Sequence, residues 1–298
     1  MNFELWGMSG SIHTERDEMM DVAQERLWHW TGLVDDACNR FRSDSEISRL
    51  NARPGETVEV GEVLALALDA AARSADETEG LCDPTVLASL LALGYDRDYD
   101  QLAAAGDRGM GDTTPAPGVA SIAFDRERRT VTLAAGCRLD LGASAKALAV
   151  DLVADDVGVL GGVAVEIGGD VAVRGRGAQG PWVIGVSDRL ITTGREPRIA
   201  LVDGAVATSS TSERTWIAGA RRINHIIDPR TGHWADGPYA TATVSASTCV
   251  SANAFATAAL LWGEQAGYHI AQAGWSARLV RHDGSIDLVG GWPEEAAA

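Results

Sequence analysis

The segment Arg138–Gly175 is the most informative about the fold class; it reads RLDLGASAKALAVDLVADDVGVLGGVAVEIGGDVAVRG. Its first half predicts the end of a strand that leads into a helix. Its second half predicts two short strands around Gly168-Gly169-Asp170, where glycines permit a tight bend. A helix followed by two short strands does not fit the strict strand–helix–strand repeat of a doubly wound fold.

The rest of the chain continues this mixed pattern. Apolar residues at helical spacing predict a helix over about residues 15–39, and Ser45 is positioned to cap a short helix. Further helices are predicted at 61–80, 82–94 and 251–263. Single strands are predicted at 4–15, 198–210 and 240–247, and hairpins at 121–136 and 278–291, the last with an Asp-Gly turn. We therefore expect an α+β fold, with mixed or antiparallel sheets and packed helices.

A chain of 298 residues is long enough for one large domain with a full core. We expect a single domain over residues 1–298, with a division into two lobes at the glycine-rich and proline-rich loop near 103–120 as an open alternative.

The charge balance excludes several partners. The net charge is −17, so the surface repels nucleic-acid backbones and anionic membranes.

The cysteines and the apolar segments bear on the compartment. The four cysteines form no CxxC pair, which argues against a zinc site or a disulfide framework. The N-terminal residues show no signal peptide, and no apolar stretch is long enough to cross a bilayer. We expect a cytoplasmic protein with no membrane insertion.

The segment RRINHIIDPRTGHW, residues 221–234, carries the densest set of reactive side chains. His225, Asp228, Arg230 and His233 lie within nine residues around a turn-forming DPRTG. A hairpin loop with polar surface side chains explains this composition as well as a proton-transfer site does. His225 precedes two isoleucines, and a partly shielded histidine suits proton transfer.

Two further segments combine small residues with a few polar ones. In LDLGASAKALAVD, Asp140 precedes a helix that carries Lys146 in its first turns. Either Asp140 caps this helix and Lys146 is solvated, or Lys146 binds a phosphate or pairs with Asp140. In SANAFATAALLWG, residues 251–263, Asn253 and Thr257 stand four apart and share one helix face. They are either capping groups, with Ser251, or half of a binding site.

Taken in order, these motifs resemble one family, the ApbE-like FAD:protein FMN transferases. The resemblance rests on MSGSI, FRSDSEISRLN, GLCDPTV, LDLGASAKALAVD, VEIGGDVAVRG, VATSSTSER, HIIDPRTG and SANAFATAALLWG. It covers most of the chain, and SEISRLN, IGGD and HIIDPRTG are its most specific parts.

The resemblance implies a fold with a core related to the T-fold and a defined activity. Such enzymes use Mg²⁺ to split FAD, move FMN to a threonine hydroxyl of a target protein with a D-x-[ST]-G-A-T type motif, and release AMP. A pyrophosphate carries dense negative charge, which a hard divalent cation neutralises during transfer. Two alternatives stay open: a non-catalytic FAD-binding protein, and an FAD pyrophosphatase that yields FMN and AMP.

The resemblance also implies roles for individual residues. It places His225 as the base that deprotonates the acceptor hydroxyl. The positions that contact FAD are Met8, Phe41, Leu81, Cys82, Asp83, Asp140, Lys146 and Ile227. The metal positions are the Ala143 carbonyl, Asn253, Ala256 and Thr257.

This sequence departs from the family pattern at the metal positions. The family usually has an aspartate where Asn253 stands, and glycines where Ala143 and Ala147 stand. An amide oxygen can bind Mg²⁺, but it brings no negative charge.

Overall fold

The computed structural model describes residues 1–104, 106–187 and 196–293 of the chain. The chain divides into two compact units. The first unit comprises Met1–Trp30, Lys146–Glu213 and Asp236–Ala298, and the second comprises Thr31–Ala145 and Arg214–Ala235. The loop near residues 103–120 lies inside the second unit. A single domain over residues 1–298 stays a prediction.

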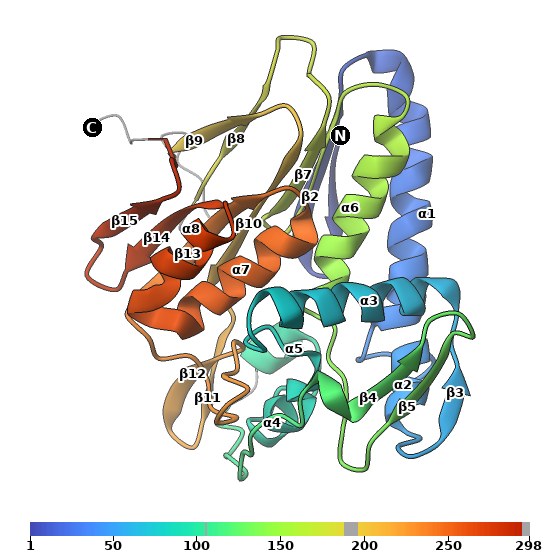
Figure 1. Ribbon diagram of the computed structural model, residues 1–298, viewed down its shortest axis with the longest axis vertical. Coiled ribbons are helices and arrows are strands. Elements are labelled where there is room, and N and C mark those ends of the chain that lie inside the picture. Colours follow the sequence, from blue (N-terminus) through green and yellow to red (C-terminus); the bar gives the residue numbers. More distant parts are fainter. Residues whose placement is uncertain (105, 188–195, 294–298) are drawn as a thin grey trace. The chain divides into compact units, whose positions relative to one another are not determined.

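An eight-stranded sheet organises the first unit (Figure 1). Its strand order is β1-β2-β6-β7-β10-β13-β14-β15, and every neighbouring pair is antiparallel. The strands span Asn2–Leu5 (β1), Met8–Thr14 (β2), Val163–Ile167 (β6), Asp170–Arg174 (β7), Gly204–Ser210 (β10), Tyr239–Ala246 (β13), Ser276–Arg281 (β14) and Ile286–Val289 (β15). A separate hairpin joins β8 (Trp182–Gly185) to β9 (Arg198–Leu201). Together with the helices, these sheets confirm the α+β prediction.

Three helices of the first unit accompany this sheet. They are α6 (Ala145–Gly158), α7 (Cys249–Trp262) and α8 (Ala266–Gln272), with a 3-10 turn at Gly263–Gln265. The long helix α1 (Met20–Cys38), preceded by a 3-10 turn at Asp17–Met19, begins in this unit and ends in the second. Trp28 of α1 packs edge-on against Phe3 of β1, with 5.5 Å between ring centroids.

Helix α7 is the most buried helix of the first unit and packs against β10 and β13 (Figure 1). Most of its residues are buried, and many of them are alanines. Alanine side chains allow a helix to lie close to a sheet, and a helix that is apolar all round is normally buried. Polar groups on α7 are therefore placed inside the unit, where each needs a partner.

The second unit combines a small sheet with short helices. Its three-stranded sheet has the order β3-β5-β4, and a further hairpin pairs β11 with β12. The strands span Thr57–Glu59 (β3), Ile122–Asp125 (β4), Thr130–Leu133 (β5), Thr215–Ala218 (β11) and Arg221–Asn224 (β12). The helices span Glu46–Asn51 (α2), Glu62–Glu77 (α3), Leu87–Ala92 (α4) and Tyr99–Ala103 (α5), with 3-10 turns at Pro84–Val86 and Val119–Ser121.

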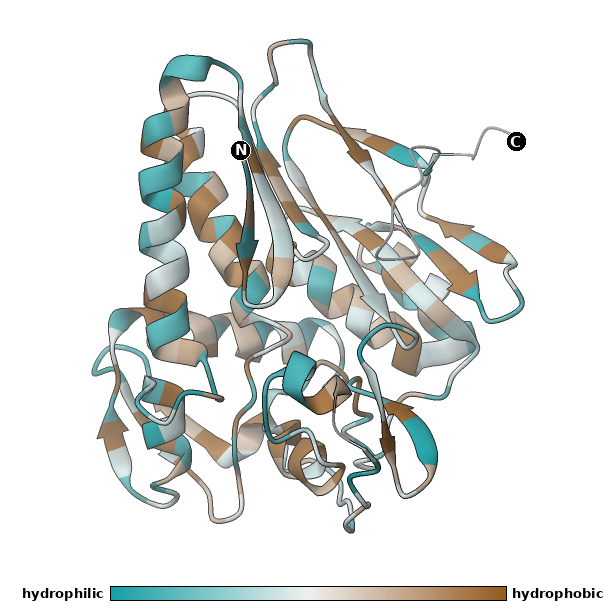
Figure 2. Cartoon of the chain, turned by 180° about the vertical axis from the view of Figure 1, so that it is seen from behind, coloured by the Kyte–Doolittle hydropathy of each residue, from teal (hydrophilic) through white to brown (hydrophobic). Residues whose placement is uncertain are grey.

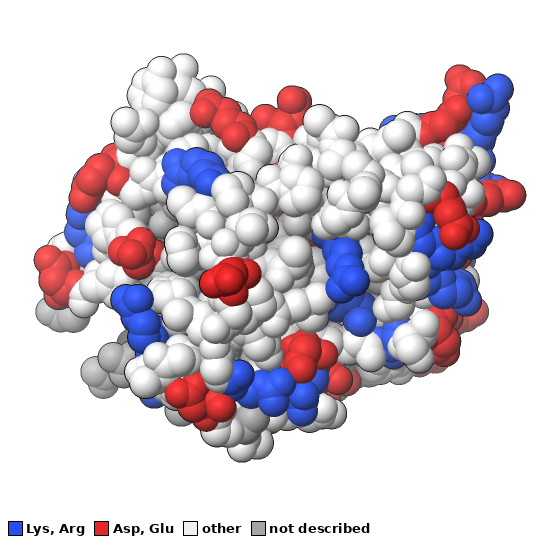
Figure 3. All heavy atoms as spheres, turned by 90° about the horizontal axis from the view of Figure 1, so that it is seen from below, with Lys and Arg blue, Asp and Glu red and all other residues white. Residues whose placement is uncertain are grey.

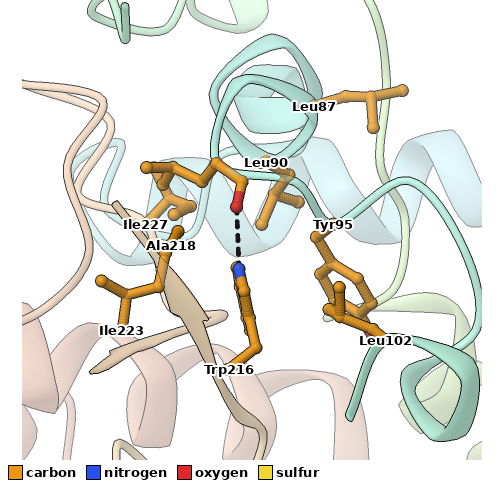
Figure 4. Close-up of a cluster of buried hydrophobic side chains, with 9 residues drawn as sticks. Leu87, Leu90, Tyr95, Leu102, Trp216, Ala218, Ile223 and Ile227 are labelled. Carbon is orange, nitrogen blue, oxygen red and sulfur yellow. Dashed lines mark hydrogen bonds between the residues drawn. The ribbon is translucent and has the colours of Figure 1, made fainter. Parts of the chain in front are cut away.

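An apolar cluster around Trp216 holds α4, α5 and the β11–β12 hairpin together (Figure 4). The Trp216 indole N–H donates to the Leu93 carbonyl over 2.7 Å, so the buried ring keeps its hydrogen bond. Its ring lies 5.3 Å from that of Tyr95, which in turn lies 5.8 Å from Phe41. The cluster members are Leu87, Leu90, Leu93, Tyr95, Leu102, Trp216, Ala218, Ile223 and Ile227.

Several local predictions are confirmed. Ser45 caps α2, with its side chain accepting from the Ser48 N–H. The hairpins over 121–136 and 278–291 are present as β4–β5 and β14–β15. The helices predicted at 15–39, 61–80 and 82–94 form with shorter bounds.

Other predictions are wrong for identifiable reasons. The first strand is a hairpin, because Trp6 and Gly7 both take positive φ (53° and 69°), as a two-residue turn requires. The strand predicted over 198–210 divides into β9 and β10. No strand ends at Leu139, whose backbone pairs with the Asn51 side chain through bonds of 2.7 and 2.9 Å.

Helices α5 and α8 and the β11–β12 hairpin were not predicted from the sequence. Figure 2 shows hydrophobic residues beside strongly hydrophilic ones on this hairpin. The segment RRIN of β12 has two exposed arginines followed by two buried residues. Its pattern is therefore not the alternation that identifies a strand.

Candidate functional site

In the first unit, three polar side chains meet inside the protein. Lys146 comes from the first turn of α6, Asp170 opens β7, and Asn253 lies on α7. Asp170 is fully buried, and its carboxylate lies 3.2 Å from the Lys146 ammonium. The Asn253 amide nitrogen lies 3.1 Å from both Asp170 oxygens. We call Lys146, Asp170 and Asn253 the buried triad.

The Gly168-Gly169 turn positions the triad. Both glycines take positive φ (56° and 85°), so β6 and β7 are joined by a tight two-residue turn that delivers Asp170 at the start of β7. The Lys146 ammonium donates to the Gly168 carbonyl over 2.8 Å. A Cβ at Gly168 would overlap the Met8 side chain, which places Met8 against this turn.

The hydrogen bonds settle the orientation of the Asn253 amide. Its nitrogen must face Asp170, because a flipped amide would set two acceptor oxygens against each other. Its carbonyl oxygen Oδ1 is buried and accepts no hydrogen bond within the part of the chain that the structure describes. A buried acceptor without a donor is costly, so this oxygen is available for a cation or a donor from a ligand.

The other proposed positions on α7 lie close by in the helix. Thr257 stands four residues after Asn253, and its hydroxyl lies 3.0 Å from that of Ser209 on β10. Ala256 is fully buried, so its side chain belongs to the packing of α7.

A capping role for Asn253 or Ser251 is wrong. The N-cap of α7 is Thr248, whose side chain accepts from the Ser251 N–H. Asp151 adds a second cap, because its carboxylate accepts from the N–H groups of Cys249 (2.9 Å) and Val250 (3.0 Å). The start of α7 is therefore satisfied without Asn253, which is left for a different role.

In the second unit, Phe41 and Asp140, two of the positions that the family resemblance assigns to FAD, contact Arg40, which the sequence did not single out. Arg40 lies directly before Phe41, and its Nε lies 2.6 Å from an Asp140 oxygen. The other Asp140 oxygen accepts from the Gly142 N–H over 2.6 Å. Asp140 therefore stabilises the turn before α6 and is not the N-cap of the helix, which begins at Ala145. Lys146 is neither solvated nor paired with Asp140, because it pairs with Asp170.

The segment Leu81–Asp83 is tied to Asp140 through the backbone. The Asp140 N–H donates to the Pro84 carbonyl over 2.8 Å. Asp83 caps the following 3-10 turn by accepting from the Thr85 N–H and hydroxyl. Leu81 and Cys82 are buried, and burial raises the pKa of the Cys82 thiol to about 12. Cys82 is therefore neither a nucleophile nor a thiolate ligand.

The DPRTG segment forms a closed loop. Asp228 accepts from the Arg230 guanidinium at 2.7 and 2.9 Å. Burial alone would raise the pKa of the Asp228 carboxyl, but the hydrogen bonds from Arg230 outweigh this effect and hold the pKa below its usual value. Gly232 has a φ of 77°, and a Cβ there would overlap the Thr114 carbonyl oxygen. Ile227 is buried in the apolar cluster, and His225 is partly buried.

The four predicted metal positions fall in both units. Ala143 belongs to the second unit and is exposed, whereas Asn253, Ala256 and Thr257 belong to the first. Within residues 1–104, 106–187 and 196–293, no three His, Cys, Asp or Glu side chains gather into a metal-binding group. In the first unit, the Asn253 and Thr257 side chains offer an amide and a hydroxyl oxygen, which are hard ligands.

Two features bear on partners. On the face drawn in Figure 3, acidic and basic side chains lie interspersed among uncharged ones. In the described part of the chain, no helix has both the length and the apolar character needed to cross a bilayer.

Comparison with known proteins gives consistent results. A model of the ApbE family matches residues 6–279. The chain is 29% identical over 276 residues to the FAD:protein FMN transferase of Vibrio cholerae serotype O1, covering 89% of this chain and 77% of that protein. The crystal structure of the ApbE protein of Thermotoga maritima superposes on this chain with a TM-score of 0.80 and 25% sequence identity, and the match covers 97% of this chain and 96% of that protein. The crystal structure of the flavinyl transferase ApbE of Pseudomonas stutzeri, in its apo form, matches this chain with a TM-score of 0.81 at 22% identity, and the match covers 100% of this chain and 97% of that protein.

Proposed function

Since this chain belongs to the ApbE family, we propose that it is an FAD:protein FMN transferase. It moves the FMN half of FAD to a threonine hydroxyl of an acceptor protein and releases AMP. The observation that carries the proposal is the buried triad, which leaves the Asn253 carbonyl oxygen without a donor in the described residues, on the helix face shared with Thr257.

The residues of this chain fit Mg²⁺ as the cofactor. Asn253 Oδ1, the Thr257 hydroxyl and the carbonyls of Ala143 and Ala256 are hard, neutral oxygen ligands of the kind that Mg²⁺ accepts. When bound, the ion would neutralise the pyrophosphate and stabilise the AMP that leaves.

The chemical step is a displacement at phosphorus. The acceptor oxygen forms a bond to the phosphorus that carries the riboflavin chain, and the phosphoanhydride bond breaks. AMP leaves with the bridging oxygen, and His225 takes the proton of the acceptor hydroxyl. In the partly buried setting of His225, that proton is shielded from bulk water.

The remaining positions bind and orient FAD. In the second unit we assign Phe41 to pack against the flavin, and Asp140, Ile227 and the Leu81–Asp83 segment to contact FAD. In the first unit we assign Met8 and Lys146 to contact FAD. Lys146 and Asp170 together are neutral, so the triad offers the pyrophosphate no excess negative charge.

One observation favours a second function. The triad has no net charge, and Asn253 adds none, so this site attracts a divalent cation less than a carboxylate would. A chain that binds FAD without turning it over would fit the same residues.

The test is a transfer assay. The protein is incubated with FAD, Mg²⁺ and an acceptor carrying a D-x-[ST]-G-A-T type motif, and the intact mass of the acceptor is measured. We expect a gain equal to one FMN moiety, which a Thr→Ala acceptor does not show. Binding of FAD without any mass gain at all Mg²⁺ concentrations would refute transfer and leave the binding function.

A further inference from the structure

Arg40 is fixed in place on several sides. Its Nε lies 2.6 Å from Asp140, and its Nη1 donates to the Tyr95 carbonyl over 2.9 Å. Only 8% of the side chain is exposed. A charged side chain buried to this degree normally has all of its donors satisfied.

Aromatic rings cover the guanidinium. Its central carbon lies 4.1 Å from the centroid of the Phe41 ring and 4.7 Å from that of Tyr95. These rings attract the cation and leave the edges of the guanidinium for hydrogen bonds. Phe41 is the residue that we assign to pack against the flavin, so Arg40 lies within the proposed binding site.

One donor of Arg40 is not used. Nη2 is buried and has no acceptor in the described residues. Arginine commonly binds a carboxylate with two parallel hydrogen bonds. Asp140 does not provide the second one, because its other oxygen accepts from the Gly142 N–H over 2.6 Å. The turn at Asp140 thus leaves Nη2 free to bind a further acceptor.

We propose that Arg40 is a substrate-binding residue whose Nη2 donates to an acceptor atom of the flavin nucleotide, either a phosphate oxygen or a carbonyl oxygen of the flavin ring. The proposal rests on the proposed function, since Phe41 and Asp140 define the site. Asp140 cancels the charge of Arg40, so the selectivity comes from a directed hydrogen bond in a buried setting.

The experiment compares two substitutions. Arg40→Lys keeps a positive charge that can pair with Asp140, but it has no Nη2. Arg42→Lys is the matched control, because Arg42 lies two residues away, is more exposed, and pairs with Asp35, Asp36 and Asp44. Dissociation constants for FAD, riboflavin and ADP are measured by calorimetry on the full chain, together with the melting temperature.

We expect Arg40→Lys to weaken FAD binding by about 10-fold to 100-fold, the loss of one hydrogen bond from a charged donor, and Arg42→Lys to change it less than about 2-fold. A matching loss for riboflavin identifies the flavin ring as the acceptor, and a matching loss for ADP identifies the phosphates. If the wild-type protein binds FAD and Arg40→Lys binds all ligands equally well, Arg40 is structural and the proposal is wrong. If the wild-type protein binds no FAD, the proposed function itself fails.

A second measurement does not depend on the folding of a variant. The arginine side-chain N–H signals of the wild-type protein are followed by ¹⁵N spectroscopy while FAD is added. A new, slowly exchanging guanidinium signal at saturation supports the proposal. The absence of any change in the arginine signals on FAD binding contradicts it.

Discussion

The buried triad of the first unit and the Arg40–Asp140 pair of the second each contain an ion pair, but they are built differently. Lys146, Asp170 and Asn253 lie on two helices and a strand, and the carboxylate at the centre is fully buried. Arg40 and Asp140 lie outside helices and strands, and the Asp140 side chain is 12% exposed.

The difference shows how each region can serve a ligand. The triad is held by regular elements, so it presents one oxygen, Asn253 Oδ1, in a fixed direction. The Arg40–Asp140 pair lies in loops, where the carboxylate, the Tyr95 carbonyl and two aromatic rings hold Arg40 so that it presents one donor, Nη2. We therefore expect substitutions in the triad to affect stability most, and substitutions in the pair to affect binding most.

The largest expected effect comes from removing the central carboxylate. Asp170→Ala leaves the Lys146 ammonium and the Asn253 amide facing a cavity, and should lower the free energy of unfolding by about 3–5 kcal/mol. Asp140→Ala should cost less, about 1–3 kcal/mol, because Arg40 keeps its bond to Tyr95 and Asp140 is more exposed than Asp170. Urea unfolding of both variants measures this. A larger loss for Asp140→Ala would reverse the comparison.

A smaller effect tests whether the loops of the second unit are rigid. Gly232→Ala should cost roughly 2–4 kcal/mol, because Gly232 has positive φ and its new Cβ would overlap the Thr114 carbonyl. Gly136→Ala is the control: its φ is also positive (82°), but no atom lies within 4 Å of the new Cβ. We expect it to cost only about 1–2 kcal/mol. If both substitutions lower the stability equally in thermal unfolding, the DPRTG loop can shift to accommodate the new Cβ, and the loop is not rigid.

Asn253→Asp tests the charge of the triad. It sets a second carboxylate against Asp170, so without metal the protein should lose about 1–3 kcal/mol of stability. The added anionic ligand should also strengthen Mg²⁺ binding, so that Mg²⁺ raises the melting temperature of the variant more than that of the wild type.

The controls for this variant are Asn253→Leu, which should show no response to Mg²⁺, and each protein in EDTA. Unchanged or weaker Mg²⁺ affinity of Asn253→Asp in calorimetry would remove Asn253 from the metal site.

The smallest expected effect concerns the reactivity of the cysteine thiols, which should be low in both units. Burial raises the pKa of Cys82 to about 12 and raises that of Cys249 well above its usual value, with the Asp170 carboxylate adding to the second. The native protein should therefore not react with a disulfide reagent at pH 8, whereas the protein in urea should react at all four cysteines.

The sign of the pH effect follows from these thiols. Their folded-state pKa values are raised, so their contribution to stability is complete below about pH 9 and is lost as the pH rises toward 12. Cys82→Ala should make the alkaline loss of stability shallower. A rise in stability above pH 9 would contradict this assignment.

The features that could be predicted from the sequence are those that depend on residues close together in the chain. The alanine-rich helix at α7, the Ser45 cap and the Asp-Gly hairpin between β14 and β15 each follow from a short segment. These signals arise because side-chain spacing and capping act over a few residues.

What the sequence did not predict depends on distant residues. Arg40 and Asp140 are joined by a 2.6 Å contact across a separation of 100 positions, and neither neighbourhood shows it. The bond pattern at Leu139 comes from the side chain of Asn51, and the triad joins residues from three elements. The site roles of the individual residues remain predictions, and they rest on the family resemblance.

The most direct test of the central claim is the release of AMP measured with and without the acceptor protein. The protein is mixed with FAD and Mg²⁺, and AMP and acceptor-bound flavin are quantified in the same samples. A transferase predicts one AMP for each flavin attached, and little AMP when the acceptor is omitted or its threonine is replaced. Release of AMP at the same rate without any acceptor, or no release in either case while FAD is bound, would contradict the account.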